Sequence, residues 1–311
     1  MSTLILNHKD FLNHIEPIGH PEQVDRMSNI LKRLRIDEFK DLIWKEAPIA
    51  TKQDLLLGHT KKYIDYIENI QTDGITTQLD GDTYFGEGTL DAAKRAVGAN
   101  ISAVNAVMSG EFSNVFCVVR PPGHHAESGK AMGFCIFGSV AIAAKFAIKN
   151  YKLKRVAIVD FDVHHGNGTQ EILWDNQNIL FVSTHQMPLW PGSGNKEETG
   201  VNNNILNIPI TANTDGVIFR KKFEEIVLPQ LDAYRPELLI VSAGFDAHYK
   251  DPLANIELRT EDYAWITSKL CDIADRYADG RIISSLEGGY DLTALADSVA
   301  IHVKVLMERG K

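Results

Sequence analysis

The chain has 311 residues, of which 44% are hydrophobic and 23% charged, and its formal net charge is -9. This composition is typical of a soluble globular protein, and an acidic chain without a long Lys/Arg run argues against nucleic-acid binding through a basic patch. No stretch approaches the roughly 18 apolar residues of a membrane span, and the N-terminus lacks the apolar core of a signal peptide. Three isolated cysteines form no disulfide framework. We therefore expect a cytoplasmic protein.

Short apolar strands alternate with amphipathic helices along the whole chain. In chain order, the patterns predict strands at 3–6, 115–119, 156–159, 179–183, 205–210, 238–241 and 282–286. They predict helices at 20–34, within 54–70, at 90–108, up to 149 after Cys135, and at 217–233, 260–277 and 293–307. Residues 72–88, rich in Gly, Asp and Thr, predict a surface loop. Because no linker interrupts this alternation, residues 1–311 are predicted to form one α/β domain, with a mainly parallel sheet and helices on both faces.

Four of the predicted strands run directly into polar segments. The richest follows the strand at 156–159, where Asp160, Asp162 and His164 alternate and would project to one side of an extended backbone. The other three segments are PPGHH at 121–125, AGFDA at 243–247 and EGGY at 287–290. Since the carboxyl ends of parallel strands share one edge of a sheet, we expect these segments to converge there on a ligand site.

The side chains of these segments favour a catalytic divalent metal. Carboxylate and imidazole groups without a thiol suit Zn²⁺ or Fe²⁺. Asp162 and His164 from one strand end and Asp246 from another would leave a coordination position open for chemistry. The alternative, a capped helix start with surface histidines, leaves several buried polar groups without partners, which is costly.

The remaining polar residues are suited to proton transfer. His124 and His125 could pass a proton from water to a leaving amine. Asp160 is placed to bond one of these rings and Asn167 the other, and Tyr290 could donate to an oxyanion. Taken singly, each group also has a structural explanation, such as a capped turn for the histidine pair or packing for the tyrosine. Together they describe metal-assisted hydrolysis of an amide.

The polar segments extend into six longer motifs: RPPGHH at 120–125, GFCIF at 133–137, VDFDVHHGNGTQ at 159–170, SAGFDAH at 242–248, DPL at 251–253 and LEGGYDL at 286–292. These motifs resemble the zinc-dependent histone deacetylases. The match is closest to the class II branch and its bacterial relatives, which include acetylpolyamine amidohydrolases. The resemblance runs from about residue 20 to 300 and implies the arginase/deacetylase fold, with an eight-stranded parallel sheet flanked by helices.

The resemblance also implies a role for each matching residue. Tyr290 becomes the catalytic tyrosine that polarises the acyl carbonyl. The implied zinc ligands are Asp162, His164 and Asp246. The implied tandem histidines are His124 and His125, with Asp160 and Asn167 as their respective partners. Family members also bind K⁺ or Na⁺ near the zinc, and the matching groups here are Asp160, Asp162, the His164 carbonyl and Ser183.

The same resemblance predicts a substrate tunnel. Phe134 and Trp190 match the paired aromatics that line the acyl-lysine tunnel, beside the carbonyl of Gly133. Trp190 stands where the family often has Phe, which would narrow or reshape this tunnel. Asp82 matches a rim aspartate that holds the substrate backbone. Leu253 stands where polyamine-selective relatives carry a glutamate, so polyamines are less favoured than acyl-lysine, although they stay an alternative.

The sequence therefore predicts a zinc-dependent amidohydrolase, with Fe²⁺ as the alternative metal, that removes acetyl or other short acyl groups from acyl-lysine in proteins or peptides, or from small acylated amines. It leaves open whether the enzyme is a homo-oligomer. A binuclear ureohydrolase of the arginase type is disfavoured, because Asn167 and His248 stand where a second metal would need carboxylates. A non-catalytic acyl-lysine binding protein is disfavoured by the intact tyrosine and histidine pair.

Overall fold

The computed structural model describes residues 2–72 and 76–310. Its centre is an eight-stranded sheet in the order β2-β1-β5-β10-β9-β6-β7-β8, in which every pair of neighbours is parallel. The strands are β1 (Leu4–Asn7), β2 (Ile43–Glu46), β5 (Asn114–Cys117), β6 (Val156–Asp160), β7 (Ile179–Gln186), β8 (Ile205–Ile210), β9 (Leu238–Ala243) and β10 (Ile282–Leu286). This confirms the predicted parallel α/β architecture.

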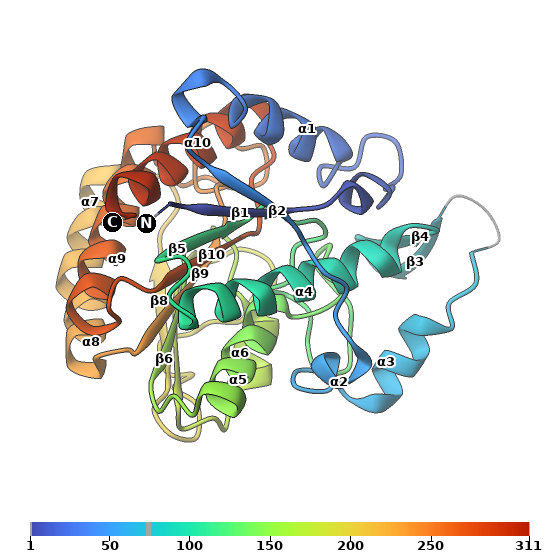
Figure 1. Cartoon of the computed structure of the whole chain (residues 1–311), viewed down its shortest axis with the longest axis horizontal. Helices are drawn as coiled ribbons and strands as arrows, with labels where there is room; N and C mark the ends of the chain where they lie inside the picture. Colours follow the sequence, from blue (N-terminus) through green and yellow to red (C-terminus); the bar gives the residue numbers. More distant parts are fainter. Residues whose placement is uncertain (1, 73–75, 311) are drawn as a thin grey trace.

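Helices cover both faces of the sheet (Figure 1). One face carries α1 (Val24–Arg33), α9 (Thr260–Tyr277) and α10 (Leu292–Arg309), and the other carries α4 (Thr89–Met108), α5 (Ser139–Tyr151) and α6 (Asn167–Leu173). Shorter helices are α2 (Lys52–Leu55), α3 (Lys61–Glu68), α7 (Gly216–Lys222) and α8 (Leu228–Tyr234). Because both faces are covered, the central strands are buried along their whole length and consist largely of apolar residues.

Two local predictions differ from the structure. The loop expected at 72–88 contains an antiparallel hairpin of β3 (Thr76–Asp80) and β4 (Thr83–Gly86), while residues 73–75 lie outside the described part. The hairpin strand β3 is polar and half-exposed, and the edge strand β2 is mostly exposed, so neither shows a strong apolar pattern. The helix expected at 217–233 is divided by one π-helical turn at Phe223–Val227.

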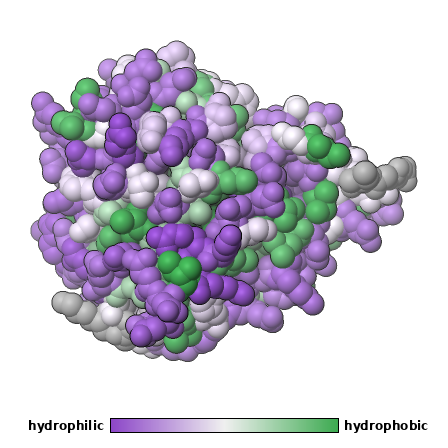
Figure 2. All heavy atoms as spheres, turned by 90° about the horizontal axis from the view of Figure 1, so that it is seen from above, coloured by the Kyte–Doolittle hydropathy of each residue, from purple (hydrophilic) through white to green (hydrophobic). Residues whose placement is uncertain are grey.

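The order of the strands explains how the polar segments converge. β5, β10, β9 and β6 are consecutive neighbours in the sheet, and each leads into one of the four segments. Parallel strands end at the same edge, so the segments after these four strands are adjacent there. The face seen in Figure 2 is mostly hydrophilic, and its apolar side chains lie in small separate groups. Within the described residues, no helix is long and apolar enough to cross a membrane.

Candidate active site

Asp162, His164 and Asp246 form a buried trio at the carboxyl edge of the sheet. The Nδ1 of His164 lies 3.3 Å from Oδ1 of Asp162 and 3.2 Å from Oδ2 of Asp246. One potential ligand atom from each residue fits within 4.8 Å of the others. The two aspartates come from different neighbouring strands, as expected from the sequence.

The surroundings of this trio suit a divalent cation. The second oxygen of each carboxylate is used by the backbone: Gly288 N–H donates to Oδ2 of Asp162 (2.8 Å), and Val163 N–H donates to Oδ1 of Asp246 (2.9 Å). Both carboxylates are fully buried, and no lysine or arginine in the described residues pairs with either. Burial and the neighbouring Asp162 raise the pKa of Asp246. Two close carboxylates without a lysine or arginine partner, together with an imidazole, match the oxygen and nitrogen ligands of zinc or iron.

A second acidic group lies elsewhere, at His14, Glu16 and Glu22. Here Glu22 is already paired with two guanidinium groups, Arg120 Nε at 2.6 Å and Arg26 Nη1 at 2.9 Å. These arginines outweigh the effect of burial and lower the pKa of Glu22 to about 2. Because two positive charges already compensate this group, its environment does not suit a metal ion.

The tandem histidines lie next to the trio of Asp162, His164 and Asp246. Each histidine has a different hydrogen-bond partner. The Nδ1 of His124 lies 3.0 Å from Oδ2 of Asp160, and the Nδ1 of His125 lies 2.8 Å from Oδ1 of Asn167. Their ring centroids are 3.8 Å apart. Burial alone would lower the pKa of His124, but Asp162 and Asp160 raise it to about 10. Burial and the nearby charge of His124 hold the pKa of His125 well below its usual value.

Tyr290 follows a glycine pair that allows the chain to approach the carboxylates. A Cβ on Gly288 would clash with carboxylate oxygens of Asp246 and Asp162, so glycine is required at this position. On the other side of the turn, Arg26 donates to the carbonyls of Gly289 (2.7 Å) and Glu287 (2.5 Å), and its guanidinium lies 4.9 Å above the Tyr290 ring. Burial raises the pKa of Tyr290 well above its usual value, so the hydroxyl keeps its proton.

A pocket of about 230 Å³ leads from the surface to these groups. The Phe134 ring stands nearly perpendicular to that of Tyr290 at 5.7 Å, and the Trp190 ring is 4.7 Å from that of His125. Gly133 has φ +56°, and a Cβ there would lie 2.5 Å from both the His125 and Trp190 rings. The complete lining is Asp82, His125, Gly133, Phe134, His164, Leu189, Trp190, Leu253 and Tyr290.

The structure thus brings together the residues expected to bind metal, transfer protons and line the tunnel. Leu189 is one lining residue that the sequence analysis did not identify. Other missed residues are buried polar groups that bond to the backbone of the turns of this site. Glu287 accepts the N–H of Gly123 (2.7 Å) and that of His124 (3.2 Å). In the sequence, Glu287 and Asp251 are visible only as charged residues inside the motifs LEGGYDL and DPL.

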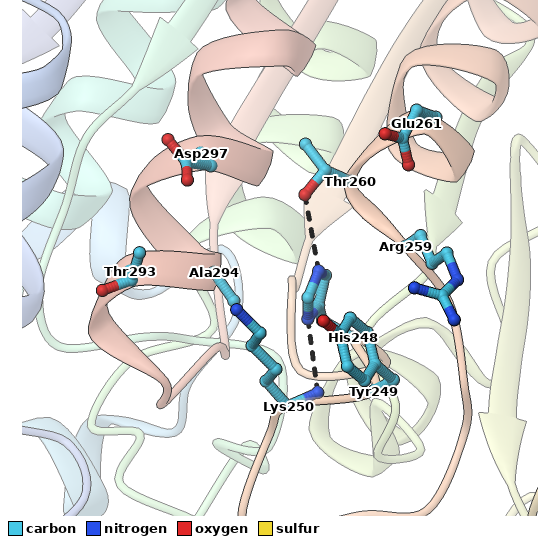
Figure 3. A pocket seen from close by; sticks show the side chains of 9 residues that line it. All are labelled: His248, Tyr249, Lys250, Arg259, Thr260, Glu261, Thr293, Ala294 and Asp297. Carbon is cyan, nitrogen blue, oxygen red and sulfur yellow. Dashed lines mark hydrogen bonds between the residues drawn. The ribbon is translucent and has the colours of Figure 1, made fainter.

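A second pocket, shown in Figure 3, lies between the loop after β9 and the first turns of α9 and α10. His248 is held here: its Nδ1 accepts the Lys250 N–H (3.3 Å), and its Nε2 lies 3.4 Å from Oγ1 of Thr260. His248 does not belong to the trio of Asp162, His164 and Asp246. The charged residues of this pocket are of both signs: Lys250, Arg259, Glu261 and Asp297.

Comparisons with known proteins agree with this geometry. The Histone deacetylase domain family matches residues 20–306, a range that includes all four strand ends. The "Probable deacetylase" of Archaeoglobus fulgidus is 36% identical over 298 residues, which cover 94% of this chain and 82% of that protein. The "Histone deacetylase-like amidohydrolase" of Pseudomonas aeruginosa is 36% identical over 277 residues, covering 88% and 73%, respectively. The crystal structure of the HDA15 HD domain matches with a TM-score of 0.93 and 33% identity, over 99% of this chain and 88% of that one.

Proposed function

The chain belongs to the histone deacetylase family, and we propose that it is a zinc-dependent enzyme that removes acetyl or other short acyl groups from acyl-lysine side chains. The family supports a deacetylase or amidohydrolase activity. The observation that carries the finer proposal is that His125, His164 and Tyr290 face one narrow, largely apolar pocket. A metal ligand, a proton-transfer group and a hydroxyl donor therefore meet at its inner end.

Asp162, His164 and Asp246 would hold the zinc ion. When bound, the ion would supply Lewis acidity to the water and to the acyl carbonyl. Tyr290 would donate its hydroxyl to the oxygen of that carbonyl as negative charge develops. The phenol is protonated and buried, so it can act as a donor without first being charged.

His125 is the residue placed to move the proton. It lines the pocket, and its Nδ1 is used by Asn167. The Nε2 is then free to take a proton from water and to return it to the departing amine. His124 lies behind it, bound to Asp160, and Asp160 fixes the ring of His124 against that of His125.

The pocket lining supports acyl-lysine over a polyamine. Phe134, Leu189, Trp190 and Leu253 offer apolar contacts to the methylene chain of lysine. Among the described residues that line the pocket, Asp82 is the one carboxylate, and it is also available to a peptide backbone. An acylated polyamine would need a further anion for each distal ammonium group. We infer that this pocket binds acyl-lysine in proteins or peptides, or small acylated amines that resemble it. We also propose that the protein is cytoplasmic.

Two measurements on the zinc-loaded protein test this function. The first compares the rate on an acetyl-lysine peptide with the rates on acetylputrescine and acetylspermidine. A preference for the peptide supports the proposal, whereas a preference for a polyamine would keep the chemistry and reject the substrate. The second measures whether the protein hydrolyses any acyl-lysine or acyl-polyamine substrate. If it binds acyl-lysine but hydrolyses none of these substrates, it is a binding protein, and the proposed activity is wrong.

A further inference from the structure

The carboxylate of Asp251 accepts hydrogen bonds from two residues that line the tunnel on different segments, Tyr290 and Leu253. Its Oδ2 accepts the backbone N–H of Tyr290 at 2.7 Å, and its Oδ1 accepts the backbone N–H of Leu253 at 3.0 Å. Both of these residues line the pocket, and Asp251 itself does not. The side chain is buried, with 8% of the residue exposed. Any effect of Asp251 on the reaction must therefore pass through the residues that it holds.

The loop that carries Asp251 is itself well fixed. The N–H of Asp251 donates to the carbonyl of His248 (2.8 Å), and the N–H of Tyr249 donates to that of Leu258 (2.9 Å). By contrast, the turn before Tyr290 contains two glycines, which give the backbone unusual freedom. Arg26 holds the carbonyls of this turn, and the Asp251 carboxylate holds the N–H of Tyr290 at its end. Without the carboxylate, the N–H of Tyr290 would lose its partner in a buried environment.

We propose that Asp251 is a positioning residue that sets the hydroxyl of Tyr290 on the acyl carbonyl and fixes it relative to the tunnel wall at Leu253. This inference rests on the proposed function, because it assigns a position to the tyrosine of that reaction. A carboxylate can accept both N–H groups, one on each oxygen. An asparagine has a single oxygen, so one of the two backbone groups must lose its partner. A displacement of about 1 Å at the reacting atoms is enough to reduce a rate roughly 100-fold.

The test is a double-mutant cycle of Asp251→Asn and Tyr290→Phe, measured on an acetyl-lysine peptide. We expect Asp251→Asn alone to lower kcat about 10- to 100-fold, with KM changed less than about threefold, because the variant misplaces a group that acts in the transition state. In the Tyr290→Phe background, which has no hydroxyl to misplace, Asp251→Asn should lower kcat less than about threefold. Equal losses in both backgrounds would show that Asp251 acts by another route and would overturn the proposal.

A matched control is Asp262→Asn. Asp262 is also buried, with 4% of the residue exposed, and its Oδ2 accepts the backbone N–H of Arg259 at 2.8 Å, but it does not line the tunnel. Its substitution should cost the same factor with and without the Tyr290 hydroxyl. Zinc content and thermal midpoint are measured for every variant, and Asp251→Ser is the substitute if the asparagine variant does not fold. A wild type with no activity rejects the proposed function, whereas an active wild type with additive losses rejects only the role of Asp251.

Discussion

The imidazole of His124 lies 3.0 Å from the carboxylate of Asp160, the last residue of β6, although β10 and β9 lie between β6 and the strand β5 that precedes His124. This carboxylate fixes the ring and, with Asp162, raises the pKa of His124 to about 10 against the effect of burial. The second histidine of the pair has a neutral amide partner instead, Asn167. The two adjacent rings therefore have opposite electrostatic environments, an arrangement that suits one neutral base supported by one charged neighbour.

Asp160→Asn is expected to lower kcat about 10- to 100-fold, because it removes the charge that supports His124 while it keeps the shape of the side chain. Steady-state kinetics on an acetyl-lysine peptide measure the loss. Zinc content should stay at the wild-type value, since Asp160 does not belong to the trio that would hold the ion. Unchanged kcat in a zinc-loaded Asp160→Asn protein would contradict the assigned role of this pair.

Removal of the metal should affect both activity and stability. Chelation is expected to abolish hydrolysis, and added zinc should restore it. Because a ligand that binds only the folded state stabilises it, zinc should also raise the thermal midpoint of the apo protein. Asp246→Asn should weaken zinc binding by at least about 10-fold, through loss of a charged ligand. Glu16→Gln is the matched control: it alters the second acidic group, so zinc stoichiometry should stay unchanged. Loss of zinc from Glu16→Gln would move the metal site to that group.

The candidate catalytic groups were accessible to sequence analysis because each follows an apolar strand directly. Asp162, His164, Asp246 and Tyr290 all lie within a few residues of a strand end, and parallel topology brings those ends together. The alternation of strands and helices predicted seven of the eight central strands from apolar patterns alone. The resemblance to a family supplied the number eight. Metal identity, residue roles and the monovalent cation site stay predictions.

The residues that sequence analysis missed share a different property. Arg26, Asp251 and Glu287 are buried charged groups whose partners are mainly backbone atoms of distant segments. Arg26 lies in the first helix, α1, yet it bonds to the carbonyl of Gly289, 263 residues later in the chain. No periodic pattern encodes such a contact, because it depends on how two turns meet in space. The hairpin at 76–86 was missed for a simpler reason, since its first strand is polar.

Trp190 should limit the size of the acyl group. Its ring lies 4.7 Å from that of His125 and within 2.5 Å of an ideal Cβ on Gly133, so it narrows the inner end of the pocket. Trp190→Ala is expected to raise the ratio of kcat/KM for butyryl-lysine over acetyl-lysine about 10-fold or more, because the larger group gains space and apolar contact. Trp174→Ala, at a tryptophan outside this pocket, should leave the ratio unchanged. An unaltered ratio in Trp190→Ala would place the size limit elsewhere.

Glu16 should make the stability of the protein depend on pH. Its side chain is only 2% exposed. Burial, and then the charge of Glu22, raise the pKa of Glu16 from 4.5 to about 9. Between these two values the unfolded chain has released the proton and the folded chain has kept it. The free energy of unfolding therefore falls as pH rises through this window, by at most about 1.4 kcal/mol per pH unit.

Glu16→Gln removes this titration and keeps a neutral side chain of similar shape. Relative to wild type, the variant should gain stability steadily from pH 5 to pH 8, as measured by urea unfolding at each pH. Glu87→Gln makes the same substitution at an exposed glutamate and serves as the matched control. If Glu16→Gln and wild type keep a constant difference across the range, Glu16 is ionised in the folded state. Its carboxylate would then be stabilised by Arg120, whose charge opposes the effect of burial on Glu16.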